Sequence, residues 1–345
     1  MRAEIDLRAI RENFSQVARS TGKTLILMVK ADAYGHGALR VARAVQAAYY
    51  GVATEDEGIP LRELGKEVLV TAPSLFNAGL WKRYDMIPMI GDRTLVEAAA
   101  KTGIKRCHLA VNSGMNRLGF SSAKECYAAA KNLLSAGVRI EGVATHYKED
   151  ADENVQGQNR AFDRAADAVR KACAEEEIAL PFTHVTGSGA LYAGKYDMLR
   201  IGLAAYGYHT GYATAGLSLR PAMRVTSTII KRKILRKGET LGYEGIYRAR
   251  GEIDAYTVLG GYGDGIARSE VGRCVIAAGR RLRIAAVCMD SFEMISDRID
   301  LAVGSRVIIL SKGVDAAYIA AHRATIPYEV LLGYDVPRAE RVYVE

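Results

Sequence analysis

The chain has 345 residues, 49% of them hydrophobic and 25% charged, which is enough for one large domain and a smaller one, each with its own core. Its net charge of +8 arises from 47 Lys and Arg residues set among 39 Asp and Glu residues, and the densest basic runs, 231–233 and 280–283, are short. This pattern indicates a solvated surface and argues against a nucleic-acid-binding groove. No run approaches the ~20 apolar residues of a membrane-spanning helix, so no membrane segment is expected.

The cysteine and acidic patterns argue against a metal site. The five cysteines are odd in number, scattered and without a CxxC spacing, which disfavours both a disulfide framework and a zinc site. The acidic segment 149–153 could attract a hard cation, but adjacent carboxylates in a loop rarely converge on one ion. We therefore expect no metal. No secretion signal is recognisable, so the chain is predicted to be cytoplasmic or a domain excised from a longer protein.

From residue 23 to about residue 207, short apolar runs alternate with amphipathic stretches. Strands that alternate with helices in this way favour a parallel sheet, and eight of them favour a closed (β/α)8 barrel of the triosephosphate-isomerase type. We therefore predict an α/β barrel domain over residues 1–216. Its eight strands are expected at 25–29, 50–54, 67–72, 86–90, 107–111, 140–145, 182–186 and 198–202.

Beyond Leu217 the long helical patterns end. Runs rich in β-forming residues, at 224–230, 283–289 and 306–310, are separated by turn glycines. Residues 217–345 are therefore predicted to form a second, mostly β domain.

The first predicted strand runs directly into Lys30, within the segment VKADAYGHG at 29–37. In a barrel, this end of a strand is the active-site face. Nearby apolar residues would lower the pKa of the amine from about 10.4 and make it a nucleophile able to form a Schiff base. The ordinary alternative is a lysine that reaches from a strand end to water.

The segment VKADAYGHG resembles the pyridoxal-phosphate signature of the alanine racemase family, and later motifs follow the order of that family along nearly the whole chain. The resemblance implies a pyridoxal-phosphate-dependent racemase that works as a homodimer, with the active site shared between subunits. It also implies that Lys30 carries the cofactor and is the base on one face of the substrate, while the Tyr34 hydroxyl contacts the cofactor phosphate. A second base is required because a single base returns the proton to the face from which it came.

The resemblance places the second base in the segment GYEGIY at 242–247. Tyr243 matches the catalytic position, is contributed by the partner subunit, and is assisted by His146 and Arg200 through a hydrogen-bond relay. A phenol with a pKa near 10 needs such assistance near neutrality. From the residues alone, a packed hairpin tyrosine is the ordinary alternative, and Tyr247 competes for the assignment.

Arg200 lies in the eighth predicted strand and resembles the family arginine that faces the cofactor's pyridine nitrogen. A guanidinium keeps its protons, so the nitrogen stays neutral and the cofactor is a weaker electron sink. Decarboxylases that share this barrel have a carboxylate at that point. Arg200 therefore favours racemisation.

Turns after the seventh and eighth strands are the usual phosphate site of such barrels. Here the resemblance implies that Ser188, the amides of Gly202 and Leu203, and Tyr334 hold the cofactor phosphate together with Tyr34. The histidine-containing turn HVTGSGA differs from the more usual family form at Gly187.

The substrate carboxylate needs donors of its own. The loop VNSGMNRLG at 111–119 resembles the family loop whose arginine binds it, which implies Arg117. The amide of Met289 would add a donor from the partner subunit, where Tyr262 would narrow the substrate entrance. Where many family members have a lysine that orients this arginine, often carbamylated, the chain has Ala110, so Asn112 or a bound anion is expected to take that role.

The leading interpretation is therefore an alanine racemase that supplies D-alanine for cell-wall peptidoglycan. A serine racemase of the same fold is the near alternative, although the bulky phenol of Tyr334 favours alanine. A decarboxylase is disfavoured by Arg200. A non-catalytic cofactor-binding protein is disfavoured by the roughly 130 residues beyond the barrel, because the single-barrel relatives that bind the cofactor have no second domain.

Overall fold

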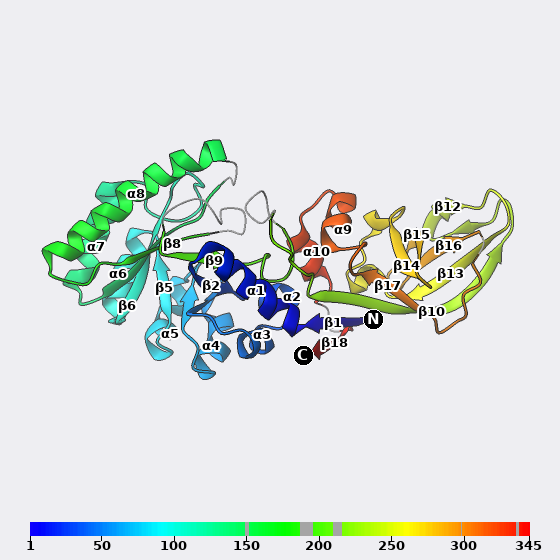
Figure 1. Ribbon diagram of the computed structural model, residues 1–345, viewed down its shortest axis with the longest axis horizontal. Helices are drawn as coiled ribbons and strands as arrows, with labels where there is room; N and C mark the ends of the chain where they lie inside the picture. The colour runs from blue at the N-terminus through cyan, green and yellow to red at the C-terminus, as the bar shows by residue number, and fades with distance from the viewer. Residues whose placement is uncertain (149–151, 187–195, 210–215, 298, 336–337) are drawn as a thin grey trace. The chain divides into compact units, whose positions relative to one another are not determined.

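The structure is a computed structural model that describes residues 1–148, 152–186, 196–209, 216–297, 299–335 and 338–345 (Figure 1). The chain divides into two compact units. The barrel unit consists of Ile10–Ala33 and Gly37–Leu219, and the β unit of Met1–Ala9, Tyr34–His36 and Arg220–Glu345. The predicted boundary after residue 216 differs from this division, because Met1–Ala9 and Tyr34–His36 belong to the β unit.

The barrel unit contains a closed ring of eight parallel strands, as predicted. The strands pair in chain order, and the last one closes the ring by pairing with the first. Because the wall is covered on both faces, each strand reads in the sequence as a short, nearly continuous apolar run. The strands are β2 Thr24–Met28, β3 Tyr49–Val52, β4 Val68–Val70, β5 Ile87–Ile90, β6 Arg106–Val111, β7 Arg139–Thr145, β8 Phe182–Thr186 and β9 Met198–Ile201.

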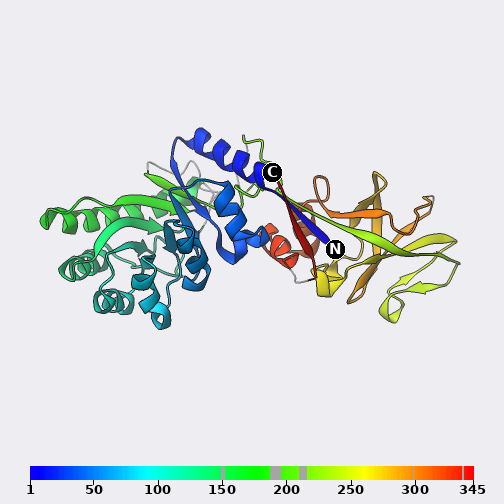
Figure 2. The same ribbon diagram turned by 90° about the horizontal axis from the view of Figure 1, so that it is seen from below.

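Helices alternate with these strands along the chain (Figure 2). Local signals fix several of their ends. Ser122 and Glu125 form a capping box at one helix start, and the Asp92 side chain accepts from the amide of Leu95 at another. The helices are α1 Leu7–Thr21, α2 Lys30–Gly35, α3 Ala38–Ala44, α4 Glu55–Glu63, α5 Ala78–Arg83, α6 Arg93–Thr102, α7 Ala123–Ser135 and α8 Asp152–Glu175, with a 3-10 turn at Leu75–Asn77.

The β unit is built on six antiparallel strands whose pairing closes on itself, in the order β10, β13, β16, β15, β14, β17 and back to β10. The hairpin between β14 and β15 turns at Ala278 and Gly279, both with positive φ, as a tight two-residue turn requires. The strands are β10 Met223–Leu235, β13 Ile253–Leu259, β14 Cys274–Ala277, β15 Arg280–Val287, β16 Ser291–Ser296 and β17 Arg306–Leu310. Smaller elements are β11 Thr240–Leu241, β12 Tyr247–Arg248, α9 Ala316–Arg323, α10 Pro327–Gly333 and 3-10 turns at Tyr243–Gly245, Tyr262–Asp264 and Arg268–Glu270.

Two further strands from opposite ends of the chain extend this sheet. β1 (Arg2–Asp6) pairs antiparallel with β10 and parallel with β18 (Glu340–Val344), and Figure 2 shows the first and last strands side by side. The β unit thus needs residues from both ends of the sequence.

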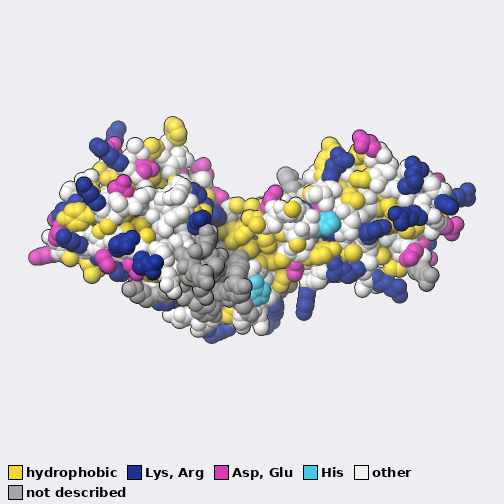
Figure 3. Space-filling view, turned by 90° about the horizontal axis from the view of Figure 1, so that it is seen from above, with side chains coloured by type: hydrophobic (Ala, Val, Ile, Leu, Met, Phe, Trp, Pro, Cys, Tyr) yellow, Lys and Arg dark blue, Asp and Glu magenta, His cyan; other side chains and the backbone are white. Residues whose placement is uncertain are grey.

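Within the described ranges, no helix is long and apolar enough to cross a membrane, and no three metal-ligating side chains come together. Residues 149–151 of the acidic segment lie outside those ranges. All five cysteines are free. On the face shown in Figure 3, Lys and Arg side chains are scattered among other types.

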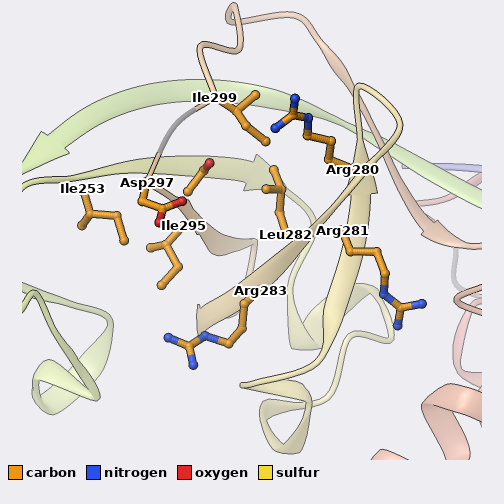
Figure 4. A pocket seen from close by; sticks show the side chains of 9 residues that line it. Ile253, Arg280, Arg281, Leu282, Arg283, Ile295, Asp297 and Ile299 are labelled. Atoms are coloured by element: carbon orange, nitrogen blue, oxygen red, sulfur yellow. The ribbon is translucent and has the colours of Figure 1, made fainter.

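One pocket of about 450 Å³ lies on the β unit and is lined by none of the predicted site residues (Figure 4). Arg280, Arg281 and Arg283 border it, and Figure 4 shows their guanidinium groups pointing in different directions. They therefore do not converge on a common anion.

Candidate active site

Lys30 follows β2 and opens a turn with unusual backbone geometry. Residues Ala31, Asp32, Ala33 and Tyr34 have φ values of +50°, +48°, +57° and +54°, so α2 winds in the left-handed sense. For residues other than glycine, this conformation costs ~1–2 kcal/mol each. Backbone strain of this kind is concentrated at functional sites.

Two carboxylates hold the two ends of this turn. Glu57 Oε1 accepts a hydrogen bond from the amide of Ala31 at 2.7 Å, and Asp32 Oδ1 accepts one from the amide of Ala38 at 2.6 Å. Lys30 is therefore fixed at the C-terminal end of β2, the end of the barrel where active sites of this fold lie.

The surroundings of Lys30 lower its pKa. Burial is the main cause, the positive charges of Arg117 and Arg200 act in the same direction, and the negative charge of Glu57 acts against them. A lowered pKa increases the fraction of neutral amine, which is the nucleophilic and basic form.

Arg200, on β9, is fully enclosed in the barrel unit. Its Nη1 donates to Nδ1 of His184 at 2.6 Å, and its Nη2 donates to the carbonyl oxygen of Thr145 at 2.6 Å. Burial and the charge of Arg117 lower the pKa of Arg200 to about 9, which still leaves the guanidinium charged at neutral pH. A fixed positive charge is therefore held inside the barrel.

Behind Arg200, a second hydrogen bond links two buried histidines. Because arginine can only donate, Nδ1 of His184 must accept, so the His184 proton is on Nε2 and points to Nδ1 of His108, 2.9 Å away. Burial and the charge of Arg200 lower the pKa of both imidazoles, that of His108 to about 3. Both histidines are therefore neutral at physiological pH.

These buried histidines should make stability depend on pH. An unfolded histidine binds a proton below about pH 6.5, whereas His108 in the folded protein stays neutral down to pH about 3. The unfolded chain therefore binds more protons in this window, and the free energy of unfolding falls as the pH falls. In His108→Asn, which keeps an acceptor near the Nδ1 position, we expect the slope to decrease by about 1.4 kcal/mol per pH unit. Urea unfolding between about pH 6 and pH 4 measures it, and an unchanged slope would contradict the buried neutral state.

His146 follows β7 at the same end of the barrel. Its pKa is lowered to about 3 by burial and by the positive charges of Arg200, Arg117 and Lys30. These electrostatic effects are mutual, so the four residues lie near one another. The structure thus brings together the four predicted site residues of the barrel that carry ionisable side chains.

The loop that carries Arg117 is ordered by Asn112, although Asn112 does not orient Arg117 itself. Asn112 Oδ1 accepts from the amides of Gly114 and Asn116, at 3.1 and 2.9 Å, and its Nδ2 donates to Asn116 Oδ1 at 2.9 Å. The Asn112 side chain therefore bonds within its own loop, to Gly114 and Asn116, and not to the guanidinium of Arg117. The expectation that Asn112 holds the guanidinium is therefore wrong.

After β9 the chain turns tightly at Gly202 and Leu203. Their carbonyls accept from the amides of Ala205 and Tyr206, at 2.9 and 3.1 Å. Their own amides donate to no protein acceptor within the described ranges, although both residues are buried. Buried N–H groups are rarely left unpaired, so these two amides are suited to hold an anion.

In the β unit, the residues predicted to act across a subunit interface are all exposed. Tyr243, Tyr262 and Met289 are 57%, 40% and 49% exposed. They lie on neighbouring segments, because the Tyr262 amide donates to the Cys288 carbonyl at 2.9 Å and the Cys288 thiol contacts the backbone of Tyr243. Large side chains exposed together in this way are typical of a contact surface.

Arg338 links the two loops that carry Tyr262 and Met289. Its guanidinium pairs with Asp264 at 3.0 Å and with Asp290 at 2.7 Å. The amide of Gly263 also donates to the Met289 carbonyl at 3.0 Å. The two exposed side chains are therefore held in a fixed relation to each other.

Comparison with known proteins identifies the family. The alanine racemase N-terminal domain model matches residues 5–210, and the alanine racemase C-terminal domain model matches residues 222–343. The alanine racemase of Thermodesulfovibrio yellowstonii is 31% identical, with 100% of this chain and 98% of that protein covered. The chain belongs to the alanine racemase family. It is therefore a member of a family of amino-acid racemases, as its motifs predict.

Solved structures agree with this. Alanine racemase from Bacillus anthracis, solved with bound L-Ala-P, superposes with a TM-score of 0.87 at 25% identity over 99% of this chain and 94% of that one. The enzyme from Bartonella henselae, solved with covalently bound pyridoxal phosphate, has a TM-score of 0.86 over 99% of both chains. At 21% identity, the second likeness shows the fold alone.

The predicted phosphate contacts also include Ser188, Tyr34 and Tyr334. Ser188, like Gly187, lies outside the described ranges. Tyr34 is buried within the β unit, with its ring centroid 5.5 Å from that of Tyr328.

Tyr334 is buried deep in the β unit, beside an ion cluster of Glu270, Arg273 and Arg323. Glu270 pairs with both arginines. Burial and the charge of Glu270 raise the pKa of the Tyr334 hydroxyl, and the two arginines offset part of this effect. The hydroxyl is therefore protonated at neutral pH and able to donate, as a phosphate contact requires.

Two residues that bond to the predicted site are not predicted from the sequence. His184 accepts a hydrogen bond from Arg200, and Glu57 accepts one from the amide of Ala31, next to Lys30. A histidine inside a buried apolar strand, as in FTHVT, is a signal that could have drawn attention to His184. For Glu57 no local signal exists, because its partner Ala31 is 26 residues away.

Proposed function

We propose that this chain is a pyridoxal-phosphate-dependent racemase that interconverts L-alanine and D-alanine. The observation that carries this proposal is the pairing of Lys30, whose pKa is lowered at the active-site end of the barrel, with the buried, charged Arg200. Membership of the alanine racemase family and the likeness to a structure with bound L-Ala-P support alanine as the substrate.

The residues present fit pyridoxal phosphate. Lys30 would hold it covalently, and the amides of Gly202 and Leu203, which have no acceptor among the described residues, would bind its phosphate, with Tyr34, Ser188 and Tyr334 as further proposed contacts. Arg200, positioned by neutral His184, would face the ring nitrogen and keep it unprotonated. When bound, the cofactor withdraws electrons from the amino acid and so makes the Cα–H more acidic.

Racemisation requires a proton to leave Cα from one face and another to arrive on the opposite face. We assign the two transfers to the amine of Lys30 and the hydroxyl of Tyr243 from the partner subunit. The exposure of Tyr243 on the β unit supports a role outside its own chain. His146, kept neutral by burial and neighbouring cations, can exchange a proton with the phenol and would form the relay to Arg200.

The substrate carboxylate would be bound by Arg117 and by the amide of Met289 from the partner subunit. In this chain Ala110 leaves no side-chain partner for Arg117 at the position where many relatives have a lysine. A bound anion is the remaining proposal for orienting it. Tyr262 of the partner subunit, fixed by the Arg338 link, would narrow the substrate entrance.

We further propose that the enzyme acts in the cytoplasm and supplies D-alanine for peptidoglycan. Five free cysteines, three of them buried, support a reducing compartment.

Alanine should be the preferred substrate over serine. We expect the phenol of Tyr334 to lie beside the substrate side chain, where it would offer an apolar ring rather than an extra hydrogen-bond partner for a hydroxymethyl group. Unmatched polar groups of this kind cost roughly tenfold or more in kcat/KM. Steady-state assays with L-alanine and L-serine, followed by chiral chromatography, measure the ratio. A preference for serine would contradict the assignment, and release of carbon dioxide would identify a decarboxylase instead.

A further inference from the structure

Glu57 connects two neighbouring barrel strands through its carboxylate. It lies in the first turn of α4, which follows β3. Its Oε1 accepts from the amide of Ala31, just after β2, and its Oε2 accepts from the amide of Ala53, just after β3, both at 2.7 Å. One side chain therefore ties together the ends of β2 and β3 at the active-site face.

The hydrogen bond from the amide of Ala31 to Glu57 lies at the start of the strained left-handed turn. Ala31 is the first of four consecutive residues with left-handed φ values. At the start of any helical turn the amides have no carbonyl partner within the turn, and the left-handed conformation is itself unfavourable for Ala31. The carboxylate thus stabilises the strained residue next to Lys30.

The charge of Glu57 acts on the same lysine. Among the described residues that shift the pKa of Lys30, Arg117 and Arg200 are cations and Glu57 is the only anion. His146, which also faces Lys30, is neutral. The hydrogen bond and the charge are therefore both directed at the Lys30 segment.

We propose that Glu57 is a positioning residue for Lys30, holding the left-handed turn through the amide of Ala31 and placing a carboxylate beside the segment that carries the amine. The structural alternative is that Glu57 only stabilises the start of α4. The bond to Ala53 fits that alternative, since it is local, but the bond to Ala31 does not. The catalytic part of the inference rests on the proposed function, whereas its structural part does not.

Hydrogen exchange on the full chain tests the structural part without any assay of activity. In Glu57→Ala, we expect exchange in a peptide covering residues 30–35 to accelerate by roughly tenfold or more, as for loss of a charge-assisted bond. Glu57→Asp should restore part of the protection. Glu63→Gln, an exposed change on the same helix, is the matched control and should leave exchange unchanged. Equal exchange in Glu57→Ala and wild type would overturn the proposal.

Chemical modification tests the charge. In Glu57→Gln, loss of the anion should move the titration of Lys30 in the cofactor-free full chain to lower pH by about one pH unit, measured as the pH dependence of Lys30 acetylation by mass spectrometry. The matching limb of the kcat profile for alanine should move in the same direction. If Glu57 acts only in folding, Glu57→Gln would lower kcat but shift neither the acetylation titration of Lys30 nor the kcat profile. That result would reject Glu57 as a positioning residue. Hydrogen exchange and Lys30 acetylation do not require racemase activity, so they would test the role of Glu57 even if the chain were not a racemase.

Discussion

Replacing Lys30 with alanine should abolish both turnover and cofactor binding. The variant loses the amine that would hold pyridoxal phosphate and one of the two bases, and a general base alone contributes about 10²–10⁴-fold. We expect racemase activity to fall by ~10⁴-fold or more, with the visible absorbance of bound cofactor lost. Chiral chromatography and an absorbance spectrum of the purified protein measure the two effects.

The control for this experiment lies at the other end of the same strand. Lys23 immediately precedes β2, so Lys23→Ala removes a lysine at the N-terminal end of the same strand, away from the proposed site. It should keep the spectrum and the activity. If Lys30→Ala retained racemisation above a tenth of wild type, Lys30 would not be a base.

Replacing Tyr243 with phenylalanine should block one of the two proton transfers while the cofactor stays bound. We expect kcat/KM to fall by about 10²–10⁴-fold in both directions, the range for loss of a general acid or base. Lys30 would remain able to remove and return a proton on its own face. In deuterated water, one enantiomer of alanine should therefore exchange its α-hydrogen without inversion, which proton NMR detects.

Tyr247 provides the matched control, because it is the other candidate tyrosine of the same segment. It packs, partly buried, against the cluster of Leu235, Ala249 and Ala255. Tyr247→Phe keeps that packing and should leave kcat within a few-fold of wild type. If the losses were reversed between the two variants, the second base would be Tyr247.

Mixing the two inactive variants tests whether the site is shared between subunits. A dimer with one Lys30→Ala chain and one Tyr243→Phe chain has one site with both bases intact only when Tyr243 crosses the interface. Random reassortment should then restore about a quarter of wild-type activity. No recovery, with mixed dimers demonstrated by native mass spectrometry, would place both bases on one chain.

The barrel was predictable because its strands are buried on both faces. Segments such as Ile87–Ile90, in which every residue is buried, leave a continuous apolar run in the sequence. The position of Lys30 followed from the same pattern, because the strand ends where the lysine begins. Short-range patterns of this kind therefore gave the barrel and the placement of its lysine.

Contacts between residues far apart in the sequence were harder to predict. The closure of the six-stranded ring depends on β10 pairing with both β17 and β13, and no local pattern specifies two partners for one strand. The Glu57 bond to Ala31 and the His184 bond to His108, across 26 and 76 residues, are of the same kind. The sequence displays each residue, but only the folded barrel brings the pairs together.

The expectation for Asn112 failed for a local physical reason. A short amide side chain at the start of a loop bonds most readily to backbone amides two to four residues ahead. Asn112 does so with Gly114 and Asn116. Proximity to Arg117 in the sequence was therefore a poor guide to its partner.

The pairing of β1 with β10 and β18 has a consequence for biosynthesis. Residues 2–6 are synthesised before the eight barrel strands, yet one of their partner strands is complete only at residue 344. At translation rates of 5–20 residues per second, β1 waits on the order of tens of seconds with this edge unpaired. All eight barrel strands are synthesised in the interval and can pair first, so the barrel can form while the edge of β1 is still unpaired.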